Sequence, residues 1–406
     1  MKTIAVVGTF DTKADEYSFV RDLIKQLGFN VFMVHVGAFE SKIDVDVNNS
    51  EVVGAAGYNI AEIAQKKDRA LATEAASNGL EILLPKLFKE GRFQGVISLG
   101  GTGGTSLATP AMRALPIGVP KIMVSTVASG NTAQYVGTSD VIMVPSIVDV
   151  AGLNSISTVI FQNAVTMIAG MLQLSDKIQS NAGQKKPTIA ATMFGVTTPC
   201  VNMAREVFEK KGYEVLVFHA TGTGGKTMES LIDSGFIDGV FDLTTTEWCD
   251  ELVGGVLNAG PHRSEAASRN KVPQVVSVGA LDMVNFGPYD TVPEQFKKRN
   301  LYKHNPTVTL MRTTVEEIKL IAEKLAEKLN LASEKTCLVL PLKGVSMIDA
   351  EGQPFYGPEE DKVLFDTLRA KVNRKVVEII EFDNHINDEA FALAAARKLI
   401  DLIEKK

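Results

Sequence analysis

Short apolar runs alternate along the chain with longer stretches whose apolar residues recur at helical spacing. Runs that are rich in Val and Ile and bounded by Gly or Pro are typical of strands in a parallel sheet covered on both faces. Residues 19–27 have the helical spacing and end at Gly28, a suitable C-cap. The alternation predicts an α/β fold of the doubly wound, Rossmann-like type with right-handed crossovers. The strands predicted in the first half are residues 4–8, 31–35, 95–99, 122–126 and 141–144.

The second half of the chain repeats the first. Residues 27–35 (LGFNVFMVH) parallel residues 211–219 (KGYEVLVFH), and residues 91–99 (GRFQGVISL) parallel residues 235–243 (GFIDGVFDL). A Val-Pro pair also precedes one later strand in each half. Because the three matches occur in the same order, we expect an internal duplication of a whole folding unit.

A polar segment separates the two copies. Residues 175–187 (SDKIQSNAGQKKP) combine Gly, Lys and Pro in the manner of a linker. We therefore expect two Rossmann-like subdomains, residues 1–178 and 185–406, with a ligand cleft between them. The final helix, residues 389–403, has one apolar face and is compatible with packing on either subdomain.

Composition narrows the class of protein. The 406 residues are 45% hydrophobic and 22% charged, with a net charge of −6, so no broad basic surface for nucleic acid is expected. Three distant cysteines form no disulfide framework, and charged residues interrupt the N-terminus too early for a signal peptide. The apolar stretch 157–174 contains polar residues and predicts a buried helix rather than a membrane span. A cytoplasmic protein without nucleic-acid or membrane partners is expected.

The first loop of interest follows the first strand. Ligands of doubly wound sheets bind beyond the carboxyl ends of the strands. In residues 8–13 (GTFDTK), a Gly followed by hydroxyls is suited to phosphate binding through backbone N–H groups. Asp11 is alternatively suited to a metal or a ribose hydroxyl. A purely structural role, with Asp11 and Thr12 capping the next helix, is equally consistent with the sequence.

The second loop, residues 98–106 (SLGGTGGTS), follows the strand at 95–99. Its four glycines let a ligand approach the backbone closely, and successive N–H groups can bind an anion. A helix is predicted over 107–115, with Pro110 in its first turn. Phosphate or carboxylate binding is favoured over a tight structural turn. The spacing of the glycines matches no nucleotide-binding motif, so it does not indicate which class of nucleotide would bind.

Two further loops lie in the second half. Residues 220–227 (ATGTGGKT) resemble a Walker A loop with Ala in place of the first Gly. A true P-loop protein also needs a Walker B carboxylate, for which Asp242 is only a weak candidate. A Gly-rich anion loop lining the interdomain cleft is therefore preferred to a true P-loop. Residues 243–248 (LTTTEW) place Glu247 at a strand end, either for polar ligand contacts or as part of a helix cap.

Candidate catalytic residues are His219, Glu247 and His385. His219 ends a strand in the position equivalent to His35, and His385 lies in the polar turn 383–388 (DNHIND). Neighbouring carboxylates can orient the ring of His385 or raise its pKa. A packing histidine and a polar turn capped by Asp388 are the structural alternatives. No recognised metal-binding or nucleophile motif occurs, and the sequence does not identify a metal.

The loops together resemble a known family. GTFDTK, SLGGTGGTSLAT, MFGVTTPCV, FHATGTGGKTMESLI, DLTTTE, GALDMVNFG and LPLKGVSMID occur in order across essentially all of the chain. They look like a family of uncharacterised bacterial and fungal proteins related to the ATP-binding N-terminal inhibitory domain of the plant tomato mosaic virus resistance protein.

This resemblance implies two Rossmann-like subdomains, a homodimer, and ATP bound mainly by the first subdomain. Lys226 departs from the Arg that is more usual in the family, which weakens the P-loop interpretation. The resemblance supplies no reaction. The residues that match the family's ATP contacts are Thr9, Phe10, Asp11, Arg69, Gly101, Thr102, Gly103, Gly104 and Thr105.

Three functions follow from these observations. The first is an ATP-binding enzyme, with or without Mg²⁺, that acts on a small metabolite as a transferase or ligase, with carboxylates among the candidate substrates. The second is a regulatory dimer that ATP stabilises and that binds a protein partner. The third is a bilobal sugar- or acid-binding protein without nucleotide.

Overall fold

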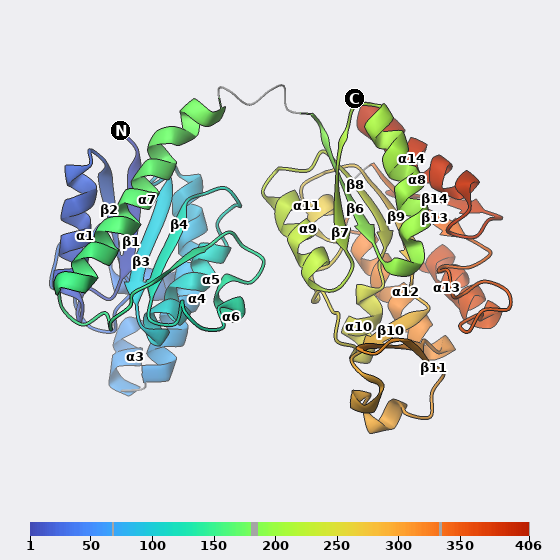
Figure 1. Ribbon diagram of the computed structural model, residues 1–406, viewed down its shortest axis with the longest axis horizontal. Helices are drawn as coiled ribbons and strands as arrows, with labels where there is room; N and C mark the ends of the chain where they lie inside the picture. Colours follow the sequence, from blue (N-terminus) through green and yellow to red (C-terminus); the bar gives the residue numbers. More distant parts are fainter. Residues whose placement is uncertain (67–68, 180–185, 333–334, 406) are drawn as a thin grey trace. The chain divides into compact units, whose positions relative to one another are not determined.

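The computed structural model describes residues 1–66, 69–179, 186–332 and 335–405. The chain divides into two compact units, Met1–Gly183 (unit 1) and Gln184–Lys406 (unit 2). Each unit contains a parallel sheet with helices on both faces (Figure 1). The predicted α/β, Rossmann-like fold class is confirmed.

Unit 1 has a five-stranded sheet in the order β2-β1-β3-β4-β5, with every pairing parallel. Each predicted strand is confirmed to within one residue. This order reverses direction between β1 and β3, and in doubly wound folds ligands bind at that switch point. The strands are β1 (Thr3–Gly8), β2 (Asn30–His35), β3 (Gly95–Gly100), β4 (Lys121–Ser125) and β5 (Ile142–Pro145).

Two layers of helices cover this sheet. One face packs on α1 (Ala14–Gln26) and α7 (Ser155–Gln179). The other face packs on α2 (Asn49–Ala55), α4 (Arg69–Lys89) and α5 (Thr102–Arg113). The short helices α3 and α6 span Ile60–Lys66 and Ala133–Val136.

Helix α7 is the one helix of the described chain that is long and apolar enough to cross a membrane by length and composition, over Ser155–Ser175. Phe161, Ala164 and Ile168 bury one of its sides against the sheet. That packing is what a core helix of an α/β unit requires.

Unit 2 has a six-stranded parallel sheet in the order β14-β13-β9-β8-β6-β7. Counted along unit 2, this is the order of unit 1 with one strand added. A small antiparallel sheet is formed by β10 (Met283–Phe286), β12 (Val308–Arg312) and β11 (Leu301–Asn305). The parallel strands are β6 (Thr188–Met193), β7 (Glu214–His219), β8 (Gly239–Thr244), β9 (Gln274–Gly279), β13 (Thr336–Pro341) and β14 (Val377–Phe382).

The helices of unit 2 also form two layers. On one face lie α8 (Thr198–Lys210) and the last helix, α14 (Glu389–Glu404), which therefore packs within unit 2. The opposite face carries the remaining helices: α9 (Thr223–Asp233), α10 (Glu247–Val253), α11 (Ala266–Arg269), α12 (Val315–Leu329) and α13 (Pro358–Lys371). Three 3₁₀ turns complete the unit: η1 (Gly195–Thr197), η2 (Tyr289–Thr291) and η3 (Glu294–Phe296).

The sequence repeats fall on equivalent strands. Residues 27–35 and 211–219 end in the edge strands β2 and β7, and the second repeat leads into β3 and β8, which pair with the first strand of each unit. In this register Gly103 corresponds to Glu247. Helices α4 and α9 precede the equivalent strands, and α5 and α10 follow them.

The predicted start of the helix after β3 is wrong. Helix α5 begins at Thr102 with Gly101 as its N-cap, so the Gly-rich segment forms the first helical turn and Pro110 lies in the interior. Thr105 fixes this turn because its N–H and hydroxyl both donate to the carbonyl of Gly101, at 2.9 and 2.8 Å. Helix α9 likewise begins at Thr223, inside the segment 220–227 that resembles a Walker A loop.

Candidate functional site

The loop after β1 is held by a buried histidine. Nδ1 of His35 accepts the N–H of Phe10 at 3.1 Å, and its Nε2 donates to the carbonyl of Phe39 at 2.8 Å. These two contacts define a neutral ring with its proton on Nε2. His35 is therefore a packing residue, the structural role that the sequence left open.

Asp11 has a different role from the predicted helix cap. Helix α1 begins after Lys13 without a side-chain cap, whereas Oδ2 of Asp11 accepts the N–H of Phe39 at 3.1 Å. Oδ1 of Asp11 is buried and has no hydrogen-bond partner among the described residues. The side chain of Phe10 is fully buried in the core. Its N–H donates to Nδ1 of His35 and its carbonyl accepts the N–H of Lys42, so Phe10 helps to hold the loop in place.

Tyr17 joins the ends of β1 and β3. Its hydroxyl donates to the carbonyl of Leu99 at 2.5 Å and accepts the N–H of the same residue at 3.0 Å. A Cβ at Gly8 would lie 2.0 Å from the ring carbon Cζ of Tyr17. Burial raises the pKa of Tyr17 to about 12, so its hydroxyl remains protonated at neutral pH. Gly8 is thus required for the packing of this edge rather than for contact with a ligand.

The first turn of α5 presents unpaired backbone donors. In an α-helix the N–H groups of the first residues have no intrahelical acceptor, here those of Thr102, Gly103 and Gly104. No side chain caps this end. Thr102 and Gly103 are exposed, and a Cβ at Gly103 would have open space around it. This turn has the composition and geometry of an anion-binding helix N-terminus.

A groove of about 710 Å³ runs beside this turn, between α4 and α5. It is a shallow groove, largely open to solvent. Gly103, the second residue of α5, lies at the groove, and the α4 residues that line it fall between Ala70 and Asn78. The lining residues are Ala70, Thr73, Glu74, Ser77, Asn78, Gly103 and Ser106.

The structure places the other predicted ATP contacts around these features. Thr9 is half-buried in the loop after β1, and its carbonyl accepts the N–H groups of Thr12 and Lys13. Arg69 is the first residue of α4, but its side chain lies outside the described part of the chain. The sequence did not single out Asp149, whose Oδ1 would lie 4.0 Å from a Cβ at Gly101. Asp149 follows the end of β5, and this position after a strand is the sequence feature that could have identified it.

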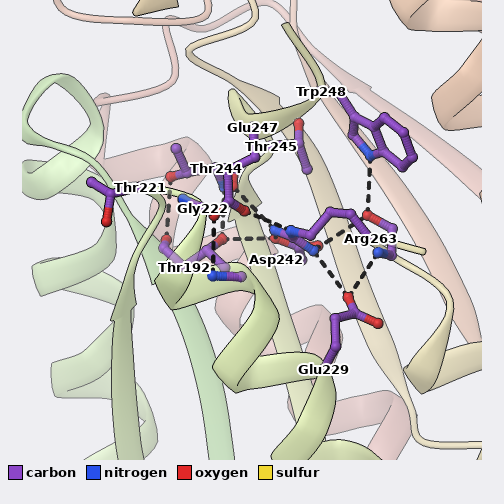
Figure 2. A network of polar contacts seen from close by, with 12 residues as sticks. Thr192, Thr221, Gly222, Glu229, Asp242, Thr244, Thr245, Glu247, Trp248 and Arg263 are labelled. Atoms are coloured by element: carbon purple, nitrogen blue, oxygen red, sulfur yellow. Dashed lines mark hydrogen bonds and ion pairs between the residues drawn. The ribbon is translucent and has the colours of Figure 1, made fainter. Parts of the chain in front are cut away.

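In unit 2 the equivalent edge contains a buried ion network (Figure 2). Arg263 forms a two-point pair with Asp242 at 2.6 and 2.7 Å, and its Nε donates to Glu247 at 2.7 Å. Asp242 also accepts the hydroxyl of Thr192 at 2.8 Å. Burial by itself lowers the pKa of Arg263, but Asp242 and Glu247 outweigh it and hold that pKa well above its ordinary value. Arg263 lies in a loop without a recognisable motif, so sequence reasoning missed it.

Glu247 fills the Walker-like loop. Its Oε1 accepts the N–H of Gly222 at 2.7 Å and that of Gly225 at 3.1 Å. A Cβ at Gly225 would lie 2.2 Å from Oε2 of Glu247, so the glycine makes room for the carboxylate. The loop therefore binds an anion, but that anion belongs to the chain itself. Lys226 is exposed and has no part in this contact.

A second backbone anion site is filled in the same way. Glu229 accepts the N–H groups of Ser264 and Ala266, both at 2.7 Å, and that of Glu265 at 3.2 Å. Ser264 has a positive φ of 65°, which turns its N–H toward the carboxylate. Burial raises the pKa of Glu229, and Arg263 opposes this shift.

The three predicted catalytic residues have separate surroundings. His219 is exposed at the end of an edge strand, with its ring 5.3 Å from that of Phe194. Nε2 of His385 contacts the carbonyl of Ser346 at 2.8 Å, and its Nδ1 accepts the N–H of Asn387 at 3.1 Å. Glu247 is buried in the ion network. Among the described residues these side chains have no hydrogen bond to one another.

Unit 2 buries further carboxylates. Burial raises the pKa of Asp250 to about 7, although the hydrogen bonds from Asn285 act to lower it. Burial and the neighbouring carboxylates together raise the pKa of Asp349 to about 9. Arg312 pairs with Asp349 and Asp361 at 3.4 and 3.2 Å. Across the described ranges no group of three or more potential ligand side chains is arranged to hold a metal ion.

The architecture thus defines a duplicated α/β protein in which the first turn of α5 in unit 1 is open, whereas the first turn of α9 in unit 2 is filled by the chain's own carboxylate. The chain belongs to the uncharacterised protein family UPF0261, whose N-terminal domain model matches residues 2–177 and whose C-terminal domain model matches residues 186–403. The suspected family relationship is confirmed.

Curated relatives agree with this assignment. A UPF0261 protein of Clostridium tetani is 55% identical over the whole of both chains. A Mesorhizobium japonicum UPF0261 protein is 45% identical over 98% of each chain. The ToMV resistance protein Tm-1 of Solanum lycopersicum is 43% identical over 98% of this chain and 55% of its own length. A Rickettsia bellii UDP-N-acetylglucosamine 2-epimerase structure covers 68% of this chain and 78% of its own, but at 9% identity and a TM-score of 0.22 it carries no argument.

Proposed function

We propose that unit 1 binds ATP, with its phosphates at the first turn of α5 and in the groove between α4 and α5. The protein would use this nucleotide in an enzymatic reaction on a small metabolite. The comparisons supply no activity, so the proposal depends on the geometry of the groove and on the internal duplication.

The observation that carries the proposal is the pairing of Gly103 with Glu247. In unit 2, Glu247 extends from the start of α10 to the first turn of α9, where its carboxylate accepts two backbone N–H groups. In unit 1 the equivalent helices are α5 and α4, and the groove lies between the first turn of α5 and the stretch of α4 from Ala70 to Asn78. Gly103 supplies no side chain there. An external anion is therefore expected where unit 2 has its own carboxylate.

Electrostatics support a phosphate at this place. The N-terminus of α5 lies at the groove and carries roughly half a positive charge. Arg69, which matches the family's basic ATP contact, directly precedes the lining residue Ala70 in the chain. The acidic Glu74 also lines the groove. A polyphosphate that carries Mg²⁺ would reduce the repulsion from this carboxylate.

The substitution Gly103→Glu tests the proposal, because it copies the arrangement of unit 2. The site is open and helical, and a glutamate in the first turn of a helix is favourable. We expect the variant to fold and to lose at least tenfold in affinity for MgATP, measured by isothermal titration calorimetry on the full chain. The added carboxylate would repel the phosphates and would also occupy the backbone N–H donors of the turn, and both effects would weaken MgATP binding.

Gly170→Glu is the matched control. Gly170 lies in α7, on the opposite face of the sheet, and a Cβ there also meets nothing within 4 Å. This variant has the same charge change and should bind MgATP as the wild type does. Absence of MgATP binding by the wild type, or equal binding by both variants, would overturn the proposed site.

A further inference from the structure

Phe39 combines an exposed ring with a firmly held backbone. The residue is 73% exposed. Its N–H donates to Oδ2 of Asp11 at 3.1 Å, and its carbonyl accepts from Nε2 of His35 at 2.8 Å and from Nδ2 of Asn49 at 3.0 Å. Single exposed apolar side chains are common, but three side-chain hydrogen bonds to the backbone of one such residue are a specific arrangement.

Two of the three supporting side chains are buried. Asp11 is 6% exposed and His35 is 1% exposed, and burying such polar groups is unfavourable unless they form hydrogen bonds. Gly37 lets the chain pass directly over them, since a Cβ there would lie 2.2 Å from Oδ1 of Asp11. The buried polar groups after β1 and β2 thus hold the backbone at residue 39 in place.

The backbone of Phe39 lies beside the carboxyl ends of β1 and β2, and β1 borders the switch point of the sheet. Phe39 follows β2 by four residues, and its supports follow β1 and end β2. Neighbouring strands are about 4.8 Å apart, so the ends of β2 and β3 are separated by roughly 10 Å. A nucleoside triphosphate can span that distance. A ligand with its phosphates at α5 can therefore bring an aromatic ring to Phe39.

We infer that Phe39 is a stacking platform for the base of the nucleotide, with Asp11 and His35 as positioning residues. The inference rests on the proposed function and extends it to the recognition of an aromatic base. A flat ring offers a π-face to any base, so the platform would select nucleotides over inorganic polyphosphate rather than one base over another.

Calorimetry on the full chain with two ligands tests this inference. MgATP carries a base, whereas magnesium tripolyphosphate offers the phosphates alone. We expect Phe39→Ala to weaken MgATP binding about 5- to 100-fold and to leave tripolyphosphate affinity unchanged. Phe39→Tyr keeps a ring and should bind MgATP as the wild type does. Phe236→Ala, which removes an exposed phenyl ring of unit 2, is the matched control.

The outcomes separate the two proposals. If the wild type binds both ligands and Phe39→Ala binds MgATP equally well, base stacking is overturned while the phosphate site stands. An equal loss of both ligands in Phe39→Ala would also overturn stacking, because it would indicate a general role in the loop. If neither ligand binds the wild type, the proposed function fails and the platform fails with it. Melting temperatures verify that each variant is folded.

Discussion

The carboxylate of Glu247 accepts the backbone N–H of Gly222 at 2.7 Å, although 25 residues separate them in the chain. This contact changes the interpretation of the most motif-like segment of the sequence. The loop at residues 220–227 has glycines, a lysine and a following helix, as a phosphate loop does. Its donors are nevertheless used within unit 2, so a nucleotide would have to displace a buried ion pair to bind there.

Removal of this built-in anion should create a site for an external one. Glu247→Ala leaves the N–H groups of Gly222 and Gly225 and the Nε of Arg263 without their acceptor, and breaking a buried pair typically costs about 3–5 kcal/mol. We expect a melting temperature several degrees below that of the wild type. Formate at tens of millimolar should restore part of the loss, because its carboxylate fits the space left by the side chain.

The control is Glu206→Ala, since Glu206 has a side chain 70% exposed and a surface partner. Surface ion pairs contribute only about 0–1 kcal/mol, so this variant should melt as the wild type does with or without formate. A formate effect of equal size on wild type and Glu247→Ala would contradict the filled-site interpretation.

Unit 2 should lose stability as the pH rises from 5 to 7. The pKa of Asp250 is about 7 in the folded protein and about 3.9 in an unfolded chain. A raised folded pKa gives stability that is complete below the unfolded value and is lost as the pH approaches the folded value. At about 1.4 kcal/mol per pH unit, this carboxyl accounts for roughly 2–3 kcal/mol between pH 5 and 7. Urea unfolding at a series of pH values measures the slope.

Asp250→Asn should flatten that slope. An asparagine is neutral throughout, and its amide can donate to Oδ1 of Asn285, which has no partner among the described residues, after the Asn285 amide rotates. A pH dependence identical to that of the wild type would show that another group is responsible. Asp349, with its pKa of about 9, would then be the next residue to substitute.

Gly8→Ala tests the packing that joins the strands of the candidate site. The added methyl would lie 2.0 Å from the Tyr17 ring, so the ring must move and its hydrogen bonds with Leu99 must weaken. Overpacking of this kind costs about 1–3 kcal/mol, which chemical unfolding can detect. Gly54→Ala, in the last turn of α2 with open space around the added methyl, should instead be neutral or stabilising by up to about 1 kcal/mol. Equal stabilities for the two variants would show that the edge tolerates the methyl.

Sequence reasoning located the candidate edge but assigned its residues unevenly. The strand ends could be predicted, because parallel strands buried on both faces leave continuous apolar runs. The start of α5 could not, since glycines indicate a loop by propensity, whereas the bonds from Thr105 to Gly101 favour a helical turn. Phe10 was expected to contact nucleotide, yet its side chain is in the core. Phe39 drew no attention because its supports come from three separate places in the chain: the loop after β1, the end of β2 and the start of α2.

The sequence by itself determined the architecture. The alternation of apolar runs predicted the strands, and the repeated segments predicted the duplicated unit, because both are local patterns that the backbone period converts directly into structure. Only the tertiary structure decided which anion sites are filled. Arg263 lies 21 residues from Asp242 and 16 from Glu247, and they meet because the strand order brings their loops to one edge. Hydrogen bonds and ion pairs act over a few ångströms, so their partners depend on the folded path of the chain and not on sequence spacing.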